Sequence, residues 1–202
     1  MGRSEVPPLP FEVAVFHLSV VLALLSLIWP APAPPVAERW RSWPVARVFP
    51  GTVPGLSPSG ARVTYVLAGV APESPCPSAF QPAAVRTGCR TALRATYADS
   101  TQTFVITVGI AVLDGPRPGS GRDGVGRPAT VRPVPFPGGA AERFGDSQYF
   151  TGVVVGSGGR YMVATAAGYA DGRAYRPGDG VLPRLRDAAR QLATALHRAM
   201  TR

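Results

Sequence analysis

The chain has 202 residues, 46% of them hydrophobic, a size typical of one folded domain with a short appendage. Its 23 glycines and 23 prolines oppose long regular helices, so the composition favours strands, turns and linkers over a helical bundle. The net charge is +9 and all 21 basic residues are arginines, so no lysine is present for a nucleotide-binding P-loop.

An uncharged apolar run, residues 13–29, follows a polar tail at residues 1–12. A membrane-spanning helix needs about 17–25 apolar residues, so this run meets the lower limit. Trp29 is placed like an interfacial aromatic residue, and Pro30 ends the helix. A proline-rich spacer covers residues 30–44. The sequence therefore predicts a transmembrane anchor or signal-like helix; a buried core helix fits poorly with the proline stretch that follows.

Two features bear on how this segment is processed and oriented. The small residues at 31–33 imitate a signal-peptide cleavage site, and cleavage would give a secreted protein. Pro34 would then be the first mature residue, where proline is a poor substrate, so we expect a retained anchor. Basic residues close after the helix favour a cytoplasmic domain, namely Arg39, Arg41 and Arg47. The cysteines favour export, so we expect a single-pass cell-membrane protein with an extracytoplasmic carboxyl-terminal domain.

Cys76 and Cys89 are the two cysteines of the chain. Twelve residues separate them, which excludes a C-x-x-C redox motif. A zinc site or a catalytic thiol would need histidine, and outside the apolar run only His197 is available, on an expected surface of the last helix. No metal site is predicted. A disulfide needs only an oxidising compartment, so we expect Cys76 and Cys89 to be bonded, with free buried thiols as the alternative.

Period-two alternation of side chains predicts most of a sheet. Residues 61–71 alternate in this way and form the first expected strand. Residues 90–113 predict a hairpin with its turn near residues 98–101. The second strand of this hairpin is apolar on both faces, so we expect it at the centre of the sheet. Before the hairpin, residues 82–86 predict a short helix.

The second half of the chain begins with a Gly/Pro/Arg-rich loop at residues 114–139, expected to be a mobile insertion. Residues 148–169 predict another hairpin. The last segment has an apolar stripe at helical spacing, formed by Leu185, Ala189, Leu192, Leu196 and Met200. Residues 45–202 therefore predict one α+β domain, an antiparallel sheet of about five strands with a carboxyl-terminal helix packed on one face.

Motifs for nucleotide or nucleophile chemistry are incomplete. Gly156 and Gly158 match the first two glycines of a dinucleotide loop, but Tyr161 stands at the third position and a strand is expected to follow. These glycines instead predict a hairpin turn. Most acids fall in expected turns, although a carboxylate pair such as Asp99 with Asp171 leaves an exported hydrolase open as an alternative. We expect a protein that is not an enzyme and has no cofactor.

Positive charge is the remaining signal. Four arginines occur every five residues through the loop at 114–139, namely Arg117, Arg122, Arg127 and Arg132. A basic loop on an exported domain would be attracted to anionic envelope polymers or lipid headgroups. Nucleic acid is excluded as a partner by the expected compartment. The alternative is charge that serves solubility alone.

The runs GCRTALRATYADSTQTFVITVGIAVLDG and AGYADGR resemble those of actinobacterial proteins with one amino-terminal hydrophobic segment. The overall outline is also similar to extracytoplasmic sensor domains of that group. The resemblance covers Val45 to Met200 loosely and implies a location more than an activity. The expected function is a membrane-anchored, non-catalytic envelope protein that acts as a binding, sensing or assembly module, whose partners are the membrane and an anionic envelope polymer or another envelope protein.

Overall fold

The computed structural model describes residues 36–85, 88–115, 130–156 and 159–202. The chain divides into two units, Met1–Pro35 and Val36–Arg202. The predicted membrane helix at 13–29 lies outside the described residues. Among the helices within them, none is both long and apolar enough to cross a membrane. The second unit begins ahead of the expected boundary at residue 45, because Val36–Ser42 forms a 3-10 helix, η1.

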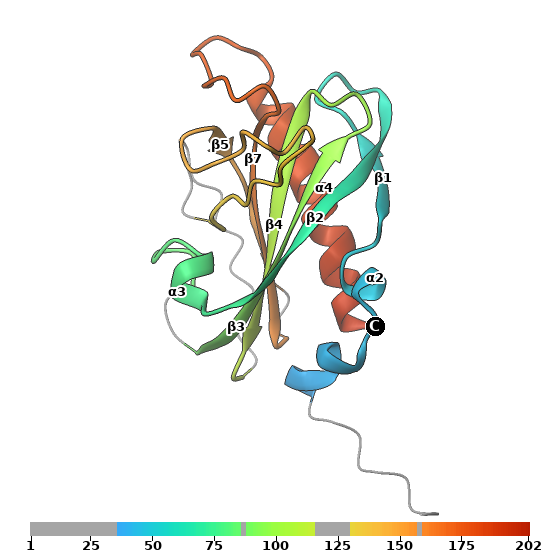
Figure 1. The fold of residues 1–202 in the computed structure, drawn as a ribbon, viewed down its shortest axis with the longest axis vertical. Coiled ribbons are helices and arrows are strands. Elements are labelled where there is room, and N and C mark those ends of the chain that lie inside the picture. Colours follow the sequence, from blue (N-terminus) through green and yellow to red (C-terminus); the bar gives the residue numbers. More distant parts are fainter. Residues whose placement is uncertain (1–35, 86–87, 116–129, 157–158) are drawn as a thin grey trace, which may run out of the picture. The chain divides into compact units, whose positions relative to one another are not determined.

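A single antiparallel sheet forms the centre of the second unit (Figure 1). Its strand order is β1-β2-β3-β4-β7-β5, and β6 also pairs with β7. The strands are β1 (Thr52–Leu56), β2 (Arg62–Ser74), β3 (Cys89–Asp99), β4 (Phe104–Leu113), β5 (Tyr149–Thr151), β6 (Val154–Gly156) and β7 (Tyr161–Tyr169). The helices that accompany them are η1, α2 (Val45–Val48), α3 (Cys76–Ala79) and α4 (Leu182–Thr201). The predicted α+β class is confirmed, with seven described strands where about five were expected.

The hairpin of β3 and β4 is the core of the sheet and confirms the sequence prediction. The two strands pair from Cys89 with Leu113 to Ala98 with Val105. All ten residues of β4 are buried, as its two apolar faces predicted. Asp99 closes the turn, because its carboxylate accepts the backbone N–H groups of Thr103 and Phe104 at 2.8 and 2.9 Å.

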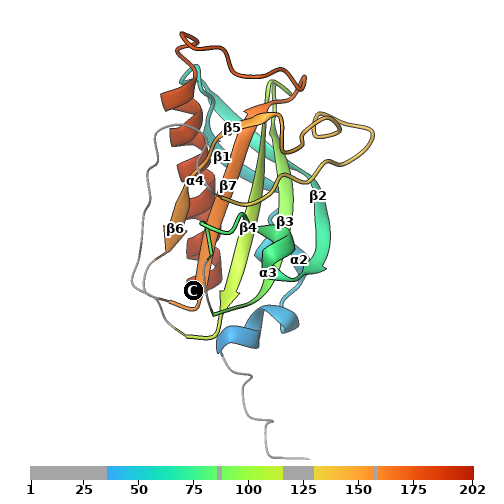
Figure 2. The ribbon, with the colours of Figure 1, turned by 90° about the vertical axis from the view of Figure 1, so that its left-hand side faces the viewer.

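One face of the sheet, called here the helix face, is covered by α4, which runs along it in Figures 1 and 2. The predicted stripe is confirmed, because all five of its residues are buried against the sheet. They contact alternate side chains of the central strands, such as Leu93 and Tyr97 of β3 and Ile106 and Ile110 of β4. Apolar residues that recur with period 3.6 on the helix therefore pack against residues that recur with period 2 on the strands, in one core.

The other face, called here the cover face, is packed under α3 and an irregular segment at residues 130–148. Phe80 and Phe144 are fully buried there, and Phe80 forms an isolated bridge with Val131. The expectation of a mobile loop over the whole of 114–139 is therefore wrong for residues 130–136. Val131 and Pro133, at alternate positions, are buried, and Phe136 packs against the same cluster, so this part of the loop has apolar side chains to bury.

Threonine side chains fix this cover to the sheet. Thr96 Oγ1 donates to the backbone carbonyl of Val134 at 2.7 Å, and Thr107 Oγ1 accepts the N–H of the same residue at 3.1 Å. Thr130 Oγ1 in turn donates to the carbonyl of Thr165 at 2.6 Å. These side chains satisfy backbone groups that have no strand neighbour, so an irregular segment is buried without unpaired polar atoms at these positions.

Glycines in three strands let the cover lie close to the sheet. A Cβ at Gly109 of β4 would stand 2.5 Å from Val131 Cγ2 and 2.9 Å from Phe80 Cε1. Gly69 of β2 lies in the same way under Phe136. A Cβ at Gly168 of β7 would meet the backbone oxygen of Gln148 at 2.5 Å. No residue larger than glycine fits at these points without displacement of its neighbour.

Three local predictions are corrected. The short helix lies at Cys76–Ala79, where Pro77 suits a first helical turn, and residues 82–84 form a turn. The first strand of the predicted hairpin at 148–169 is split into β5 and β6, because Val153 N donates to Thr165 Oγ1 and interrupts the ladder. Strand β1 was not predicted, since Pro54 and Gly55 are unusual in strands; an edge strand tolerates them.

Candidate functional site

The disulfide between Cys76 and Cys89 is present, as the sequence predicted. It joins the first residue of α3 to the first residue of β3, with a Cα–Cα distance of 6.1 Å. Both cysteines pack with the cover face, and Cys76 is buried. The bond therefore ties the segment that carries Phe80 to the central hairpin. Its place in the fold indicates a structural role.

Of the four loop arginines, only Arg132 lies within the described residues; Arg117, Arg122 and Arg127 lie outside them. The structure does not leave Arg132 in a free loop. Its backbone N–H donates to the carbonyl of Ala79 at 2.8 Å, and its guanidinium pairs with Asp146 at 3.3 Å. Arg132 also faces Arg94, whose pKa is lowered by burial first and by Arg132 second. Arg132 therefore belongs to the packed cover.

The acidic residues considered for hydrolysis stabilise their own local structure. Asp99 is buried and holds the β3–β4 turn, with a further hydrogen bond from Thr101 Oγ1. Asp171 accepts the backbone N–H of Arg173 at 3.0 Å in an exposed turn. Asp179 accepts the Tyr169 hydroxyl at 3.2 Å. Within the described part of the chain, no group of three His, Cys, Asp or Glu residues could hold a metal ion.

His197 was expected on the surface of the last helix, and this prediction is wrong. The side chain is 5% exposed, between α4 and β7, because its position falls beside Leu196 on the packed side of the helix. Burial lowers the pKa of His197, and a hydrogen bond with the backbone of Tyr161 acts in the opposite direction. A neutral histidine is thus part of the core.

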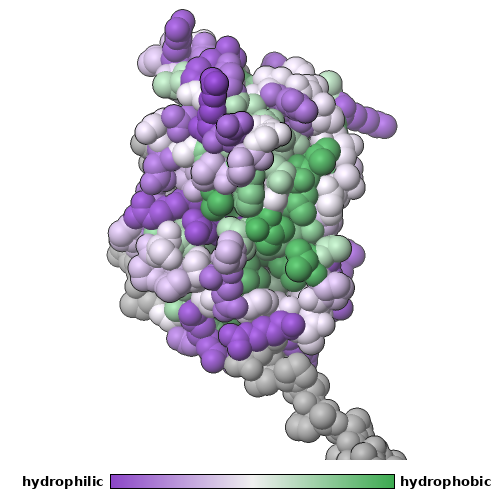
Figure 3. Space-filling view, viewed as in Figure 1, coloured by the Kyte–Doolittle hydropathy of each residue, from purple (hydrophilic) through white to green (hydrophobic). Residues whose placement is uncertain are grey.

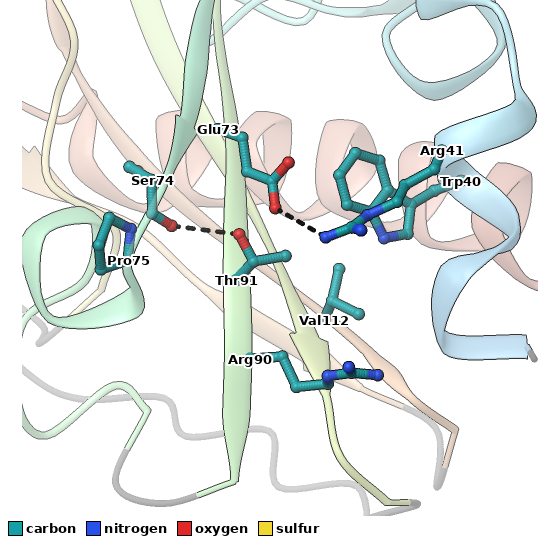
Figure 4. A pocket seen from close by; sticks show the side chains of 8 residues that line it. All are labelled: Trp40, Arg41, Glu73, Ser74, Pro75, Arg90, Thr91 and Val112. Atoms are coloured by element: carbon teal, nitrogen blue, oxygen red, sulfur yellow. Dashed lines mark hydrogen bonds and ion pairs between the residues drawn. The ribbon is translucent and has the colours of Figure 1, made fainter.

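Two hollows lie beside η1. The first, with a volume of about 520 Å³, is shown in Figure 4 between η1 and strands β2, β3 and β4. Trp40 and Arg41 point into it from η1, and Arg41 pairs with Glu73 of β2 at 3.6 Å (Figure 4). Arg90 of β3 pairs with Asp114 at 3.6 Å. The charges of this hollow are therefore largely matched by neighbouring carboxylates.

The second hollow, called here the arginine hollow, has a volume of about 500 Å³. It is formed where η1, α2, the start of β7 and the end of α4 meet. The side chains that matter for its chemistry are Arg39, Trp43, Arg47, Arg160, Tyr161 and Met200. Arg47 stacks on the indole of Trp43 at 4.0 Å, which fixes one wall. Arg202 also lines the hollow, so four arginines and two aromatic rings surround one depression.

Two of the arginines influence the Tyr161 hydroxyl, which lines the same hollow. Burial raises the pKa of the Tyr161 phenol, whereas Arg39 and then Arg160 lower it, so both guanidinium groups act on the same hydroxyl. Arg160 donates to the backbone carbonyl of Asp114 at 2.5 Å. No described carboxylate lies within ion-pair range of Arg39, Arg47 or Arg160. The hollow therefore carries positive charge without a described counter-ion.

A small apolar patch on the outer side of β1 and β2 is visible in Figure 3. Leu56, Val66 and Val70 are between 37% and 44% exposed. Beyond Leu67, no described strand pairs with the outer edge of β2, but two register irregularities and Pro72 interrupt that edge. Such features protect an edge strand from pairing with another chain. Nothing in the described part of the chain identifies what would cover this patch, so no function is assigned to it.

Comparison with known proteins finds no matching family model, no matching curated protein and no matching solved structure. The site residues are therefore assigned from geometry alone.

Sequence reasoning did not find the arginine hollow. Arg39 and Arg47 were noted only for their bearing on membrane orientation, and Arg160 only as a residue of the predicted hairpin at 148–169. One local signal was present, because Arg39, Trp43 and Arg47 recur at spacings of four, which interleaves cations with an aromatic residue. The contribution of Arg160 depends on how β7 meets η1, and no local pattern carries that information.

We expect stability to depend on pH through His197. Its pKa in the folded state lies below the ordinary value of 6.5, so the unfolded chain binds more protons between these two values. The contribution of His197 to the free energy of unfolding should therefore have its full value above about pH 6.5. It should decrease as the pH falls below that value. Urea titrations from about pH 7.5 to about pH 5 measure this slope.

The matched control is His197→Gln, whose amide can still donate a hydrogen bond but does not titrate. His197 is the only histidine after His17, so few other groups titrate near neutrality. The difference in stability between wild type and variant should change with pH below about 6.5. An unchanged difference across the range would show that His197 does not titrate differently on unfolding.

Proposed function

We propose that the chain is a membrane-anchored binding module outside the cytoplasm, with its binding face at the end of the domain next to the anchor. One observation carries the proposal: both hollows are lined by η1, the first element after the predicted membrane segment. Trp40 and Arg41 line one hollow, and Arg39 lines the other. Concave sites with aromatic walls and a few polar groups are typical of ligand binding.

The length of the chain supports a site near the membrane. Trp29, at the end of the predicted anchor, lies ten positions before Arg39 in the sequence. Even fully extended, this stretch spans at most about 35 Å. A ligand at or near the membrane surface is therefore presented to this face at high local concentration, and weak contacts suffice to hold it.

The disulfide supports export, since such bonds persist in oxidising compartments and are rare in the cytosol. The described turn carboxylates give no support to the hydrolase alternative. A general acid and base must both reach a substrate, whereas Asp99 is 1% exposed and Asp171 lies in an exposed turn with its own hydrogen bond. The proposal of a non-catalytic module therefore has the better support.

Photo-cross-linking in intact cells tests this proposal. A photoreactive residue is placed at Thr201, beside the arginine hollow, or at Arg62, in the hairpin at the opposite end of the domain in Figure 1. Both positions are exposed. We expect several-fold more adducts, with lipid or protein, from Thr201 than from Arg62. Equal or reversed yields would contradict a binding face at the anchor end.

A further inference from the structure

We propose that the arginine hollow binds the phosphate group of anionic phospholipid headgroups. This inference rests on the proposed function, because it names the ligand of the anchor-proximal face. Arg39 lies in η1, Arg47 lies in α2, and Arg160 directly precedes β7, so separate parts of the fold supply these cations. Guanidinium groups match the geometry of phosphate oxygens and bind them with two hydrogen bonds at a time.

The charges of the hollow are available to a ligand. None of the three guanidinium groups has a described carboxylate within ion-pair range, in contrast to Arg41 and Arg90 in the first hollow. Arg39, Arg160 and Tyr161 line the same hollow, and both guanidinium groups lower the pKa of the Tyr161 phenol. An anion bound there would relieve the mutual repulsion of these cations. The first hollow, which contains Glu73, offers no such excess of charge.

The walls of the hollow suit a headgroup better than a free inorganic ion. Trp43, Tyr161 and Met200 place two aromatic rings and a thioether beside the cations. Tryptophan and tyrosine are enriched at the level of lipid headgroups, because their side chains combine an apolar ring with a polar N–H or O–H group. The glycerol and ester portion of a phospholipid can pack on these side chains while its phosphate contacts the arginines. The short tether to the predicted anchor keeps the hollow within reach of such lipids.

The test uses the full chain in nanodiscs, so that the predicted anchor is inserted in a lipid bilayer in every sample. Discs contain either phosphatidylcholine alone or a mixture with phosphatidylglycerol, and thermal unfolding of the domain is followed by its fluorescence. A ligand that binds only the folded state raises Tm. We expect phosphatidylglycerol to raise the Tm of the wild type by about 3 °C at low salt.

The variant replaces the three cations by R39Q, R47Q and R160Q. Its control, R62Q with R143Q and R176Q, loses the same charge at exposed arginines away from the hollow. The Tm increase should persist in the control and be lost in the hollow variant. A shift of equal size in both triple variants would overturn the proposal, because it would reflect net charge alone.

A second experiment distinguishes the phosphate of a lipid headgroup from a soluble phosphate. Glycerol phosphate is added to phosphatidylcholine discs and compared with sodium chloride at equal ionic strength. We expect a dissociation constant at least tenfold weaker than for the lipid, because the tether no longer raises the local concentration. Equal or stronger binding of soluble phosphate would reject the lipid as the preferred source.

The results also separate this inference from the proposed function. No Tm shift by either phosphate source, together with strong cross-linking from Thr201, would reject the phosphate ligand and retain the anchor-proximal binding face. Weak cross-linking from Thr201 with a clear, arginine-dependent Tm shift would retain the phosphate site and reject its use as the main contact in cells.

Discussion

Replacement of Cys76 and Cys89 by serine is expected to lower the free energy of unfolding by about 3 kcal/mol. The bond closes a loop with a sequence separation of 13, and its removal restores that conformational freedom to the unfolded chain. The serine hydroxyls would in addition be placed against the apolar cover face. Urea unfolding of the variant and the wild type at neutral pH measures the loss.

Reduction provides the matched control for this prediction. A reductant that opens the disulfide should destabilise the wild type by a similar amount and leave the double serine variant unchanged. Thiol labelling of intact cells reports on location with the same residues, because an exported domain should label only after reduction. A variant as stable as the wild type would show that packing of α3, and not the covalent bond, holds the cover in place.

Gly109→Val is expected to destabilise the domain by about 3 kcal/mol. A Cβ at this position would stand 2.5 Å from Val131 Cγ2 and 2.9 Å from Phe80 Cε1, and valine adds two methyl groups beyond it. β4 lies in the middle of the sheet and cannot move away from the cover, because α4 packs on the other face of the sheet. The cover must therefore move away from the sheet, which exposes buried apolar surface. Urea unfolding measures this effect also.

Gly51→Val is the control for the substitution itself. A Cβ there meets nothing within 4 Å, and Gly51 is exposed. We expect a change of less than about 0.5 kcal/mol, as for surface positions in general. Hydrogen exchange adds a local measure, because Gly109→Val should speed exchange at Val134, whose N–H is bonded to Thr107. Unaltered exchange at Val134 would show that the cover accommodates the larger residue.

Elements whose sequence signals are periodic and local could be predicted before the structure was known. The β3–β4 hairpin was predicted because its side chains alternate with period two and its turn carries Asp99. Helix α4 was predicted because its apolar residues recur every three or four positions. The disulfide followed from the residue count, since two cysteines and one available histidine leave no complete metal site. Each of these inferences needed no knowledge of distant parts of the chain.

Short and irregular elements were predicted less well. Strand β1 contains Pro54 and Gly55, and β5 and β6 have three residues each, too few for a period to be recognised. His197 was placed on the surface because its own side chain is polar, whereas the packed side of α4 is wide enough to include it. A polar residue at the margin of an apolar stripe is buried or exposed according to what packs against the helix.

The cover face and the arginine hollow depend on contacts between distant segments of the chain. Residues 130–136 have the composition of a linker, and their burial depends on Gly109 and Thr107 in a strand that precedes them by more than twenty residues. The arginine hollow joins Arg39 with Arg160, which are more than a hundred residues apart. Local patterns predict local structure because backbone geometry is set by near neighbours. Contacts between distant segments are set by how complete elements pack, and the cluster of cations follows from that packing alone.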